Sequence, residues 1–576
     1  MPTGTPDACF SHPVTTFFIM SSVPLIPESA PFNTEQRAWL NGFLAGLLSR
    51  GESMTPGAPV PALQEKPRLL IAFGSQSGNA ESLAKRLGKE ASSRGFAARV
   101  AGLDSVQPST LTAEQNVLVI TSTWGEGDMP DNAESFWSGI NQNGSSPTLG
   151  GLKYSVLALG DKNYGDTFCL AGRKLDERFA ELGATRIHPR VDCDVDFDEP
   201  AKLWSEGVWK VLNESPATTT TAPAPAIAEV SIAAPAAEAT GVAAYSKKNP
   251  FPAPLVTNLK LNGANSAKDT RHIAFSLEGS GLVYETGDAL GVIPQNCPEV
   301  VAGIIATYEL DPAALVPLPD GGEAPLQEAL QKYYEVRNFL GRKPPQAVSA
   351  AEFVGSLRKL QPRLYSIASS QKAHPNEVHL CVGSVRYEQD GIAHGGVCST
   401  FLADRLPLGE PTGVFVHTAK HFRVPANPDM PMIMVGPGTG IAPFRAFLEE
   451  REATGAKGKN WLFFGDQKRK HDFLYDEQIH QWLKDGHLTR LDTAFSRDQA
   501  EKVYVQDRMM QAASELWQWL EEGAHFYVCG DASRMAKDVD AALHMLIQQQ
   551  GHKSADEATA YVADLKKTKR YARDVY

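Results

Sequence analysis

The stretch Met434-Val-Gly-Pro-Gly-Thr-Gly-Ile-Ala-Pro443 decides the fold of the C-terminal part of this chain. An apolar strand over 432–435 runs into a glycine turn at 436–440, and the pattern predicts a helix over 444–451. In such a strand–turn–helix unit, backbone amides and the positive end of the helix can approach a pyrophosphate. A glycine turn can also be only a tight connection, so its interpretation depends on the rest of the chain.

Length and composition limit the possible functions. The chain has 576 residues, which is too long for one hydrophobic core and predicts three or four domains. A net charge of -12 argues against nucleic acid as a partner and suits a basic protein surface. The seven cysteines include no C-x-x-C pair, so we expect no metal site and a reducing, cytoplasmic compartment. No apolar run approaches the roughly 20 residues that span a bilayer, so no membrane association is expected.

The domain organisation follows from a linker and from the alternation of elements. Residues 216–244 are nearly all Ala, Pro and Thr, and we interpret them as a flexible linker. In 67–215, short apolar strands alternate with helical patterns, which predicts a parallel, doubly wound sheet. The segment 245–427 is rich in strands but has a partly helical insertion at about 297–360, and 428–576 alternates strands and helices again. The predicted fold class is multidomain α/β, with a barrel between two doubly wound domains.

Residues 1–66 precede the first domain and contain one amphipathic pattern. Asn33 is a plausible N-cap, and Trp39, Phe43 and Leu47 fall on one helical face. This face either packs on its own domain or contacts a partner or a second copy of the chain. The sequence favours neither reading.

Three strand ends in 67–215 carry loops that suit one flat, phosphorylated ligand. Gly74-Ser-Gln-Ser-Gly-Asn-Ala80 crowds neutral donors into one turn, which suits a phosphate monoester. The next two loops place Trp124 and Tyr164 beside glycines, where two rings could sandwich an isoalloxazine. Each loop alone could be an ordinary turn. The candidate FMN-binding residues are Ser75, Gln76, Ser77, Gly78, Asn79, Ala80, Ser122, Thr123, Trp124, Gly125, Leu159, Gly160, Asp161, Asn163, Tyr164 and Phe168.

With these loops, 67–215 resembles flavodoxin, and the whole chain resembles the diflavin reductases. Arg363-Leu-Tyr-Ser366 is similar to the R-x-Y-S motif of the ferredoxin-reductase-like FAD barrel, and 378–387 is predicted to be a β-rich segment. The resemblance implies that Arg363 binds the FAD pyrophosphate, Tyr365 stacks on the flavin and Ser366 lies near flavin N5. The candidate FAD-binding residues are Arg363, Leu364, Tyr365, Ser366, Cys381, Val382, Gly383, Tyr387, Gly396, Val397, Cys398, Ser399 and Tyr576. The connecting insertion is shorter than is typical of the family.

Hydroxyl groups and cations after a later strand suit an adenosine 2′-phosphate, so NADPH is preferred over NADH. The alternative reading is a solvated basic loop. The candidate NADP-binding residues are Gly438, Thr439, Ser496, Arg497, Lys502, Tyr504, Gln506 and Asp538. The family resemblance also places three side chains beside the flavin and an aromatic residue over its face. These candidate catalytic residues are Ser366, Cys529, Asp574 and Tyr576.

Among the diflavin reductases, three segments are similar to the bacterial sulfite reductase flavoproteins: the helix beginning at Thr34, the stretch 399–405 and the chain end. That resemblance implies electron flow from NADPH through FAD and FMN to a sirohaem and iron–sulfur hemoprotein that reduces sulfite to sulfide. It also implies that the acidic run 192–199 meets the acceptor. Two alternatives stay open. One is a soluble P450-reductase-like donor to another haem protein, and the other is a redox-inactive scaffold subunit, against which the intact motifs argue.

Overall fold

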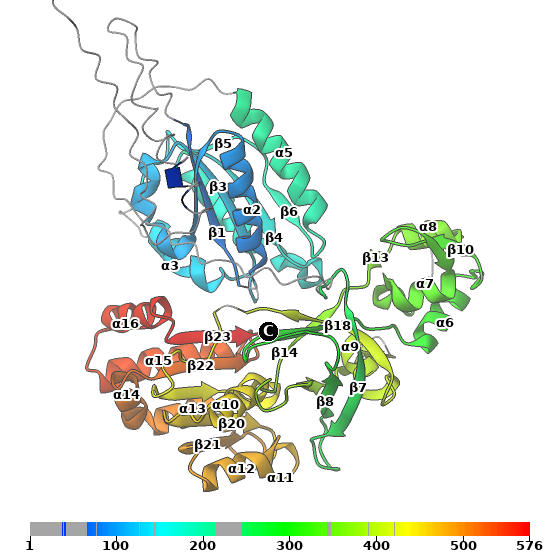
Figure 1. The fold of residues 1–576 in the computed structure, drawn as a ribbon, viewed down its shortest axis with the longest axis vertical. Coiled ribbons are helices and arrows are strands. Elements are labelled where there is room, and N and C mark those ends of the chain that lie inside the picture. Colours follow the sequence, from blue (N-terminus) through cyan, green and yellow to red (C-terminus); the bar gives the residue numbers. More distant parts are fainter. Residues whose placement is uncertain are drawn as a thin grey trace, which may run out of the picture. The chain divides into compact units, whose positions relative to one another are not determined.

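The structure is a computed structural model (Figure 1). It describes residues 66–576 apart from Ser77, Glu126, 142–145, 215–244, 343–346, Asp390 and Lys420, and before them only Arg37, Leu40 and Asn41. These three early residues are helical; the rest of the predicted N-terminal helix and the 216–244 linker lie outside the described residues. The chain divides into two compact units, 1–66 and 67–576. The features below belong to the second unit.

The first sheet of this unit is parallel, with the strand order β2-β1-β3-β4-β5 and with β6 paired to the end of β4. This is a flavodoxin-like order, in which ligands bind where the order reverses, here beside the ends of β1 and β3. The strands are β1 (Arg68–Gly74), β2 (Ala97–Gly102), β3 (Asn116–Ser122), β4 (Lys153–Leu159), β5 (Thr185–Arg186) and β6 (Val191–Cys193). The helices are α2 (Asn79–Ser93), α3 (Asp131–Ile140), α4 (Leu170–Glu181) and α5 (Asp198–Glu214).

Strand β1 shows why these segments are apolar throughout. Successive side chains of a strand point to opposite faces of the sheet. Leu69 and Ile71 pack with α2 and α5, whereas Leu70 and Ala72 pack with α3 and α4. Both faces are therefore covered by helices, as the uninterrupted apolar runs predict.

The next sheet is antiparallel, in the order β14-β9-β18-β7-β8-β15. A bridge between Ile367 and Leu380 brings the two outermost strands together, so the sheet curls into a barrel. Its strands are β7 (Phe251–Lys260), β8 (Thr270–Ser276), β9 (Ala289–Val292), β14 (Arg363–Ser366), β15 (Glu377–Gly383) and β18 (Pro411–His417). The β-rich segment predicted over 378–387 contains two strands rather than one. The chain breaks after Gly383, and Arg386–Gln389 (β16) forms a separate hairpin with Ile392–Gly395 (β17). Val397–Thr400 (α9) follows.

The insertion at about 297–360 has its own small core. Val301 and Ile304 of one helix pack against Leu326 and Leu330 of the next and against Phe353 of a third. The elements are α6 (Pro298–Thr307), β10 (Leu315–Pro317), β11 (Glu323–Pro325), α7 (Leu326–Lys332), β12 (Tyr334–Glu335), α8 (Ala350–Gly355) and β13 (Arg358–Lys359). The insertion is thus partly helical, as predicted, with two short hairpins in addition.

The last sheet is parallel, in the order β21-β20-β19-β22-β23. The strand order reverses between β19 and β22, which places a ligand site at their carboxyl ends. The strands are β19 (Met432–Val435), β20 (Asn460–Asp466), β21 (Arg490–Phe495), β22 (His525–Gly530) and β23 (Tyr571–Val575). The helices are α10 (Ala442–Thr454), α11 (Arg469–Asp472), α12 (Asp476–Lys484), α13 (Val505–Gln511), α14 (Ala513–Glu521), α15 (Met535–Gln550) and α16 (Ala555–Lys567).

The end of the chain is an ordered strand. Residues 571–575 pair in parallel with 526–530 of β22, which fixes Asp574 opposite Cys529. Among the described residues, no helix combines the length and the apolar character needed to cross a membrane.

Candidate functional site

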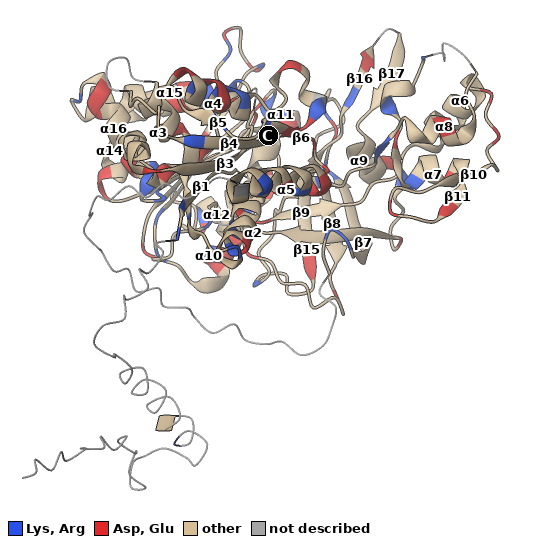
Figure 2. Ribbon diagram, turned by 90° about the horizontal axis from the view of Figure 1, so that it is seen from above, with Lys and Arg blue, Asp and Glu red and all other residues tan. Residues whose placement is uncertain are grey.

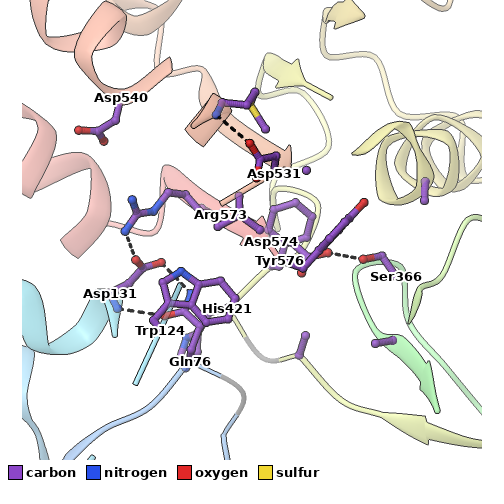
Figure 3. A pocket seen from close by; sticks show the side chains of 18 of the residues that line it. Gln76, Trp124, Asp131, Ser366, His421, Asp531, Asp540, Arg573, Asp574 and Tyr576 are labelled. Carbon is purple, nitrogen blue, oxygen red and sulfur yellow. Dashed lines mark hydrogen bonds and ion pairs between the residues drawn. The ribbon is translucent and has the colours of Figure 1, made fainter. Parts of the chain in front are cut away.

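One large cavity runs along the carboxyl ends of the strands, and Figure 3 shows part of it. Its volume is about 2730 Å³, whereas pockets for one small ligand are about 300–1,000 Å³. Its lining includes Ser75 after β1, Ser366 on the barrel, Thr439 after β19 and Tyr576 at the chain end. The cavity therefore has room for more than one nucleotide-sized ligand.

The loop after β1 has the features of a phosphate site. Helix α2 begins after Gly78, whose φ is 83°, and no side chain caps the helix. The buried hydroxyl oxygen of Ser75 has no partner among the described residues, although buried polar groups are normally bonded. Gln76 and Asp131 exchange two hydrogen bonds of 3.0 Å, which hold this loop against α3. A phosphate monoester fits the free hydroxyl and the open helix end.

We predict that Ser75→Ala lowers the affinity for FMN by about tenfold, because one hydrogen bond to the phosphate is lost. The same change removes an unpaired buried hydroxyl, so the flavin-free protein should keep or gain thermal stability. FMN fluorescence titration and thermal unfolding measure the two effects. Ser93→Ala at the exposed end of α2 is the control. Unchanged FMN affinity in Ser75→Ala would contradict this role.

The other candidate FMN residues divide into two groups. Gln76, Gly78, Asn79 and Trp124 line the cavity. Tyr164 is 60% exposed and lies outside the lining, so the two-ring sandwich stays a prediction. Also outside the lining are Ala80, Ser122, Thr123, Gly125, Leu159, Gly160, Asp161 and Phe168. Ser77 and the side chain of Asn163 lie outside the described parts of the chain.

Arg363 projects from the barrel strand β14 into the cavity. Its guanidinium donates to the Glu335 carboxylate at 3.1 Å and to the carbonyl of Gln361 at 2.6 Å. Glu335 belongs to the insertion, and nothing in the sequence had indicated it. Ser384 presents a buried hydroxyl without a partner among the described residues. A cation and a free hydroxyl on the same wall fit a diphosphate group.

Most of the remaining candidate FAD residues line the cavity, but two do not. Leu364, Tyr365, Cys381, Gly383, Gly396, Val397, Cys398 and Ser399 line the cavity. Val382 instead points into the barrel core, because side chains alternate along β15. Tyr387 lies outside the lining and stacks on His394, with ring centroids 5.0 Å apart and planes 8° from parallel. His394 is a ring partner that sequence reasoning missed.

Ser366 and Asp574 line the cavity, and the buried Cys529 lies behind them. The Ser366 hydroxyl donates to Asp574 Oδ2 at 2.5 Å, and the Cys529 thiol lies 3.8 Å from the same oxygen. Burial raises the pKa of the Asp574 carboxyl, and the hydrogen bonds from Ser366 and Cys529 oppose that rise. Burial also raises the pKa of the Cys529 thiol, and Asp574 raises it further, so this cysteine stays protonated at neutral pH.

The last residue completes this wall. The Tyr576 hydroxyl and Thr439 Oγ1 are 2.8 Å apart, and 58% of Tyr576 is exposed. Figure 3 shows Tyr576 beside Asp574 and opposite Ser366. On the same strand, Arg573 forms an ion pair with Asp131 of α3. The four candidate catalytic residues are therefore brought together, although two are about 200 positions from Ser366.

The glycine turn after β19 has two kinds of glycine. A Cβ on Gly440 would lie 2.1 Å from the carbonyl oxygen of Cys529, so only glycine fits against β22 there. Gly436 is equally confined, by the Phe444 ring at 2.5 Å. Gly438 has φ of 58° and nothing closer than 3.8 Å, so it faces open space. The first two glycines allow close packing, and the third lets a ligand approach the backbone.

The other candidate NADP residues stand around this turn. Thr439, Ser496, Tyr504, Gln506 and Asp538 line the cavity, whereas Arg497 and Lys502 do not. Elsewhere among the described residues, His374, Glu377 and His379 have a composition that can bind a metal ion. His374 lies 3.3 Å from Glu449, and His379 lies 2.9 Å from Glu377. These contacts explain the cluster as a polar network on the barrel.

Fold and site together define a class of flavoprotein oxidoreductase with one flavodoxin domain, one FAD domain and one nicotinamide-nucleotide domain. Family models agree: Flavodoxin matches residues 71–204, FAD binding domain matches 243–336 and 319–401, and Oxidoreductase NAD-binding domain matches 434–541. These matches confirm the predicted multidomain α/β fold and agree with the predicted cofactors FMN, FAD and NADPH.

Full-length relatives narrow the class. The chain is 45% identical over 608 residues to the sulfite reductase (NADPH) flavoprotein alpha-component of Bacillus subtilis, covering 97% of this chain and 98% of the relative. It is 40% identical to the protein of that name from Vibrio vulnificus, covering 96% of each chain. It is 38% identical to the protein of that name from Klebsiella pneumoniae, covering 96% of this chain and 98% of the relative. The chain therefore belongs to the family of sulfite reductase (NADPH) flavoprotein alpha-components.

Proposed function

We propose that this chain is the cytoplasmic flavoprotein subunit of an assimilatory NADPH-dependent sulfite reductase. It passes electrons from NADPH through FAD and FMN to a sirohaem and iron–sulfur hemoprotein, which reduces sulfite to sulfide. The observation that carries the proposal is one continuous cavity lined by Thr439, Ser366, Asp574, Trp124 and Ser75. When bound, the flavins accept two electrons as a hydride and release them singly, as a haem acceptor requires.

Asp574 gives the hydride site its electrostatic character. A nicotinamide becomes cationic as it gives up a hydride, and a buried carboxylate stabilises that developing charge. The hydrogen bond from Ser366 fixes the carboxylate, and the thiol of Cys529 adds a second, weaker contact. Tyr576, held by Thr439, covers this wall until a nicotinamide takes its place. Together these side chains orient the substrate and keep water out.

The preference for NADPH rests on the groups near the glycine turn. Ser496 and Tyr504 offer hydroxyl groups at the cavity wall. Arg497 directly follows Ser496, and Lys502 lies two residues before Tyr504. Hydroxyl groups and cations together suit a 2′-phosphate, whereas a ribose 2′-hydroxyl is usually bound by an acidic residue. Asp538, which does line the cavity, accepts a hydrogen bond from Gln506 at 3.4 Å.

The proposed acceptor surface is the acidic run 192–199. Figure 2 shows acidic and basic positions interspersed along the described elements. In the run itself, Asp194 lies 3.4 Å from Arg358, and Asp196 accepts from Gln361 at 3.0 Å. A basic surface on a hemoprotein would compete with these contacts. The predicted N-terminal helix is proposed to contact the partner protein or a second copy of this chain.

The proposal is tested by mixing the flavin-loaded chain with purified sirohaem sulfite reductase hemoprotein, NADPH and sulfite, and measuring sulfide. We expect three NADPH to be oxidised per sulfide, because each supplies two of six electrons. Cytochrome c is the control acceptor. Reduction of cytochrome c without sulfide formation would move the acceptor to another haem protein, and no NADPH oxidation with either acceptor would refute the proposed function.

A further inference from the structure

A lysine from the barrel reaches the glycine turn of the nucleotide domain. Lys268, in the loop between β7 and β8, donates to Asp466 Oδ1 at 2.6 Å. Asp466 is the last residue of β20, next to the end of β19 in the sheet. A Cβ placed on Gly438 would lie 3.9 Å from Lys268 Nζ and 3.8 Å from Asp466 Oδ2. The ion pair therefore faces the one glycine of the turn that is open to a ligand.

One oxygen of the Asp466 carboxylate has no partner in the described part of the chain, whereas Oδ1 also accepts from the backbone amide of Gln467 at 2.6 Å. Asp466 is 1% exposed, and its Oδ2 has no hydrogen-bond donor among the described residues. Burial raises the pKa of Asp466, and Lys268 is the main opposing influence. Buried carboxylate oxygens are normally bonded, because an unsatisfied one is costly. Since Asp466 lines the cavity, a donor on a bound ligand can satisfy this oxygen.

Lys268 is held in place by its loop. Asn262 donates to Asp472 of α11 at 3.0 Å, and Ser266 donates to the same carboxylate. The backbone amide of Gly263 donates to the carbonyl of His471 at 2.8 Å. Three contacts thus fix the loop to the nucleotide domain. This lysine is pre-positioned, unlike a lysine that moves freely on the surface.

We propose that Lys268 and Asp466 form a nucleotide-binding pair: Lys268 binds the pyrophosphate of NADPH, and the free oxygen of Asp466 accepts a hydrogen bond from a ribose hydroxyl. This inference rests on the proposed function and adds residues from outside the predicted NADP set. A lone carboxylate beside a diphosphate would repel it, and the ammonium of Lys268 makes the pair neutral. With 36% of its side chain exposed, Lys268 can turn toward an incoming phosphate.

Two nucleotides that differ in the pyrophosphate provide the test. NADP⁺ contains both the 2′-phosphate and the pyrophosphate, whereas 2′-AMP contains only the 2′-phosphate. We expect K268Q to weaken NADP⁺ binding by about 10- to 100-fold, because a charged hydrogen bond is lost. Binding of 2′-AMP should stay within about twofold. Calorimetric titration of the FAD-loaded chain measures both affinities, and a thermal melt confirms folding.

Three further variants sharpen the result. K372Q is the matched control, because Lys372 pairs with Glu450 at 2.7 Å, also between the barrel and the nucleotide domain, but outside the cavity lining. It should bind NADP⁺ normally. K268R should keep most of the affinity. The double variant K268Q/D466N should bind NADP⁺ better than K268Q, because it no longer has the buried Asp466 carboxylate that K268Q leaves without its lysine partner.

Some outcomes would overturn the inference. If K268Q weakens the binding of NADP⁺ and of 2′-AMP equally, or weakens neither, then the pair only joins the barrel to the nucleotide domain. A double variant no better than K268Q would contradict the charge argument. If the unaltered chain binds neither nucleotide, the proposed function itself fails, and that result is distinct from a defect confined to K268Q.

Discussion

Asp574→Asn should slow flavin reduction by NADPH by about 100-fold, the usual effect of removing one preorganised electrostatic contact from a buried site. The amide can still accept the hydrogen bond from Ser366, so the wall keeps its geometry while the negative charge is lost. FAD content and NADP⁺ affinity should change little. Anaerobic rapid mixing with NADPH, followed at the flavin absorbance band, measures the rate. Asp485→Asn, at the end of α12, is the control.

The same variant should be more stable than the unaltered protein, by an amount that grows with pH. The folded-state pKa of Asp574 is raised by burial, so the unfolded chain ionises first, from about pH 4 upward. Above that pH, the carboxylate costs stability until the folded state also ionises. Asparagine removes the cost. Thermal melts at pH 5 and pH 8 should show a larger difference in melting temperature between the variant and the unaltered protein at pH 8. A smaller difference at pH 8 would contradict the raised pKa of Asp574.

Gly440→Ala should abolish reduction by NADPH, with a loss of at least about 100-fold, and should lower stability by about 1–3 kcal/mol. The new methyl group would lie 2.1 Å from the carbonyl oxygen of Cys529, so the turn or the end of β22 must move. Either movement displaces the nucleotide site from Ser366. Reduction by dithionite should be unaffected, because it does not need the nucleotide site.

Gly303→Ala is the matched control for this substitution. Gly303 lies within α6, nothing stands within 4 Å of an added Cβ, and its φ is not positive. Alanine there should leave activity unchanged and raise stability by about 0.5–1 kcal/mol. A Gly440→Ala protein that is reduced normally by NADPH would show that the packing of the turn against β22 is not required.

The strand-end loops are the part of the candidate site whose position in the fold can be predicted from the sequence. A strand, a glycine turn and a helix are contiguous, so 432–451 shows both the fold and the ligand type without any tertiary information. The same holds for the loop after β1. The catalytic wall was placed by family resemblance, because Ser366, Cys529 and Asp574 are far apart in the sequence and only the sheet pairing brings them together.

Other parts of the site could not be predicted, for physical reasons. Lys268 and Glu335 act through contacts between domains, and no local pattern reports such contacts. Val382 points into the core because of the pleat of β15, which depends on where that strand begins and ends. The end of β15 at Gly383 cannot be recognised from the sequence, because the residues that follow keep a strand-like pattern.

The central claim is that electrons reach the hemoprotein only by way of FMN. The most direct measurement compares the complete chain with the same chain after selective removal of FMN, each mixed anaerobically with NADPH and hemoprotein. FAD absorbance should bleach at the same rate in both. The hemoprotein should be reduced only by the complete chain, and added FMN should restore its reduction by the depleted one. Equal reduction of the hemoprotein by the FMN-free chain would contradict the account.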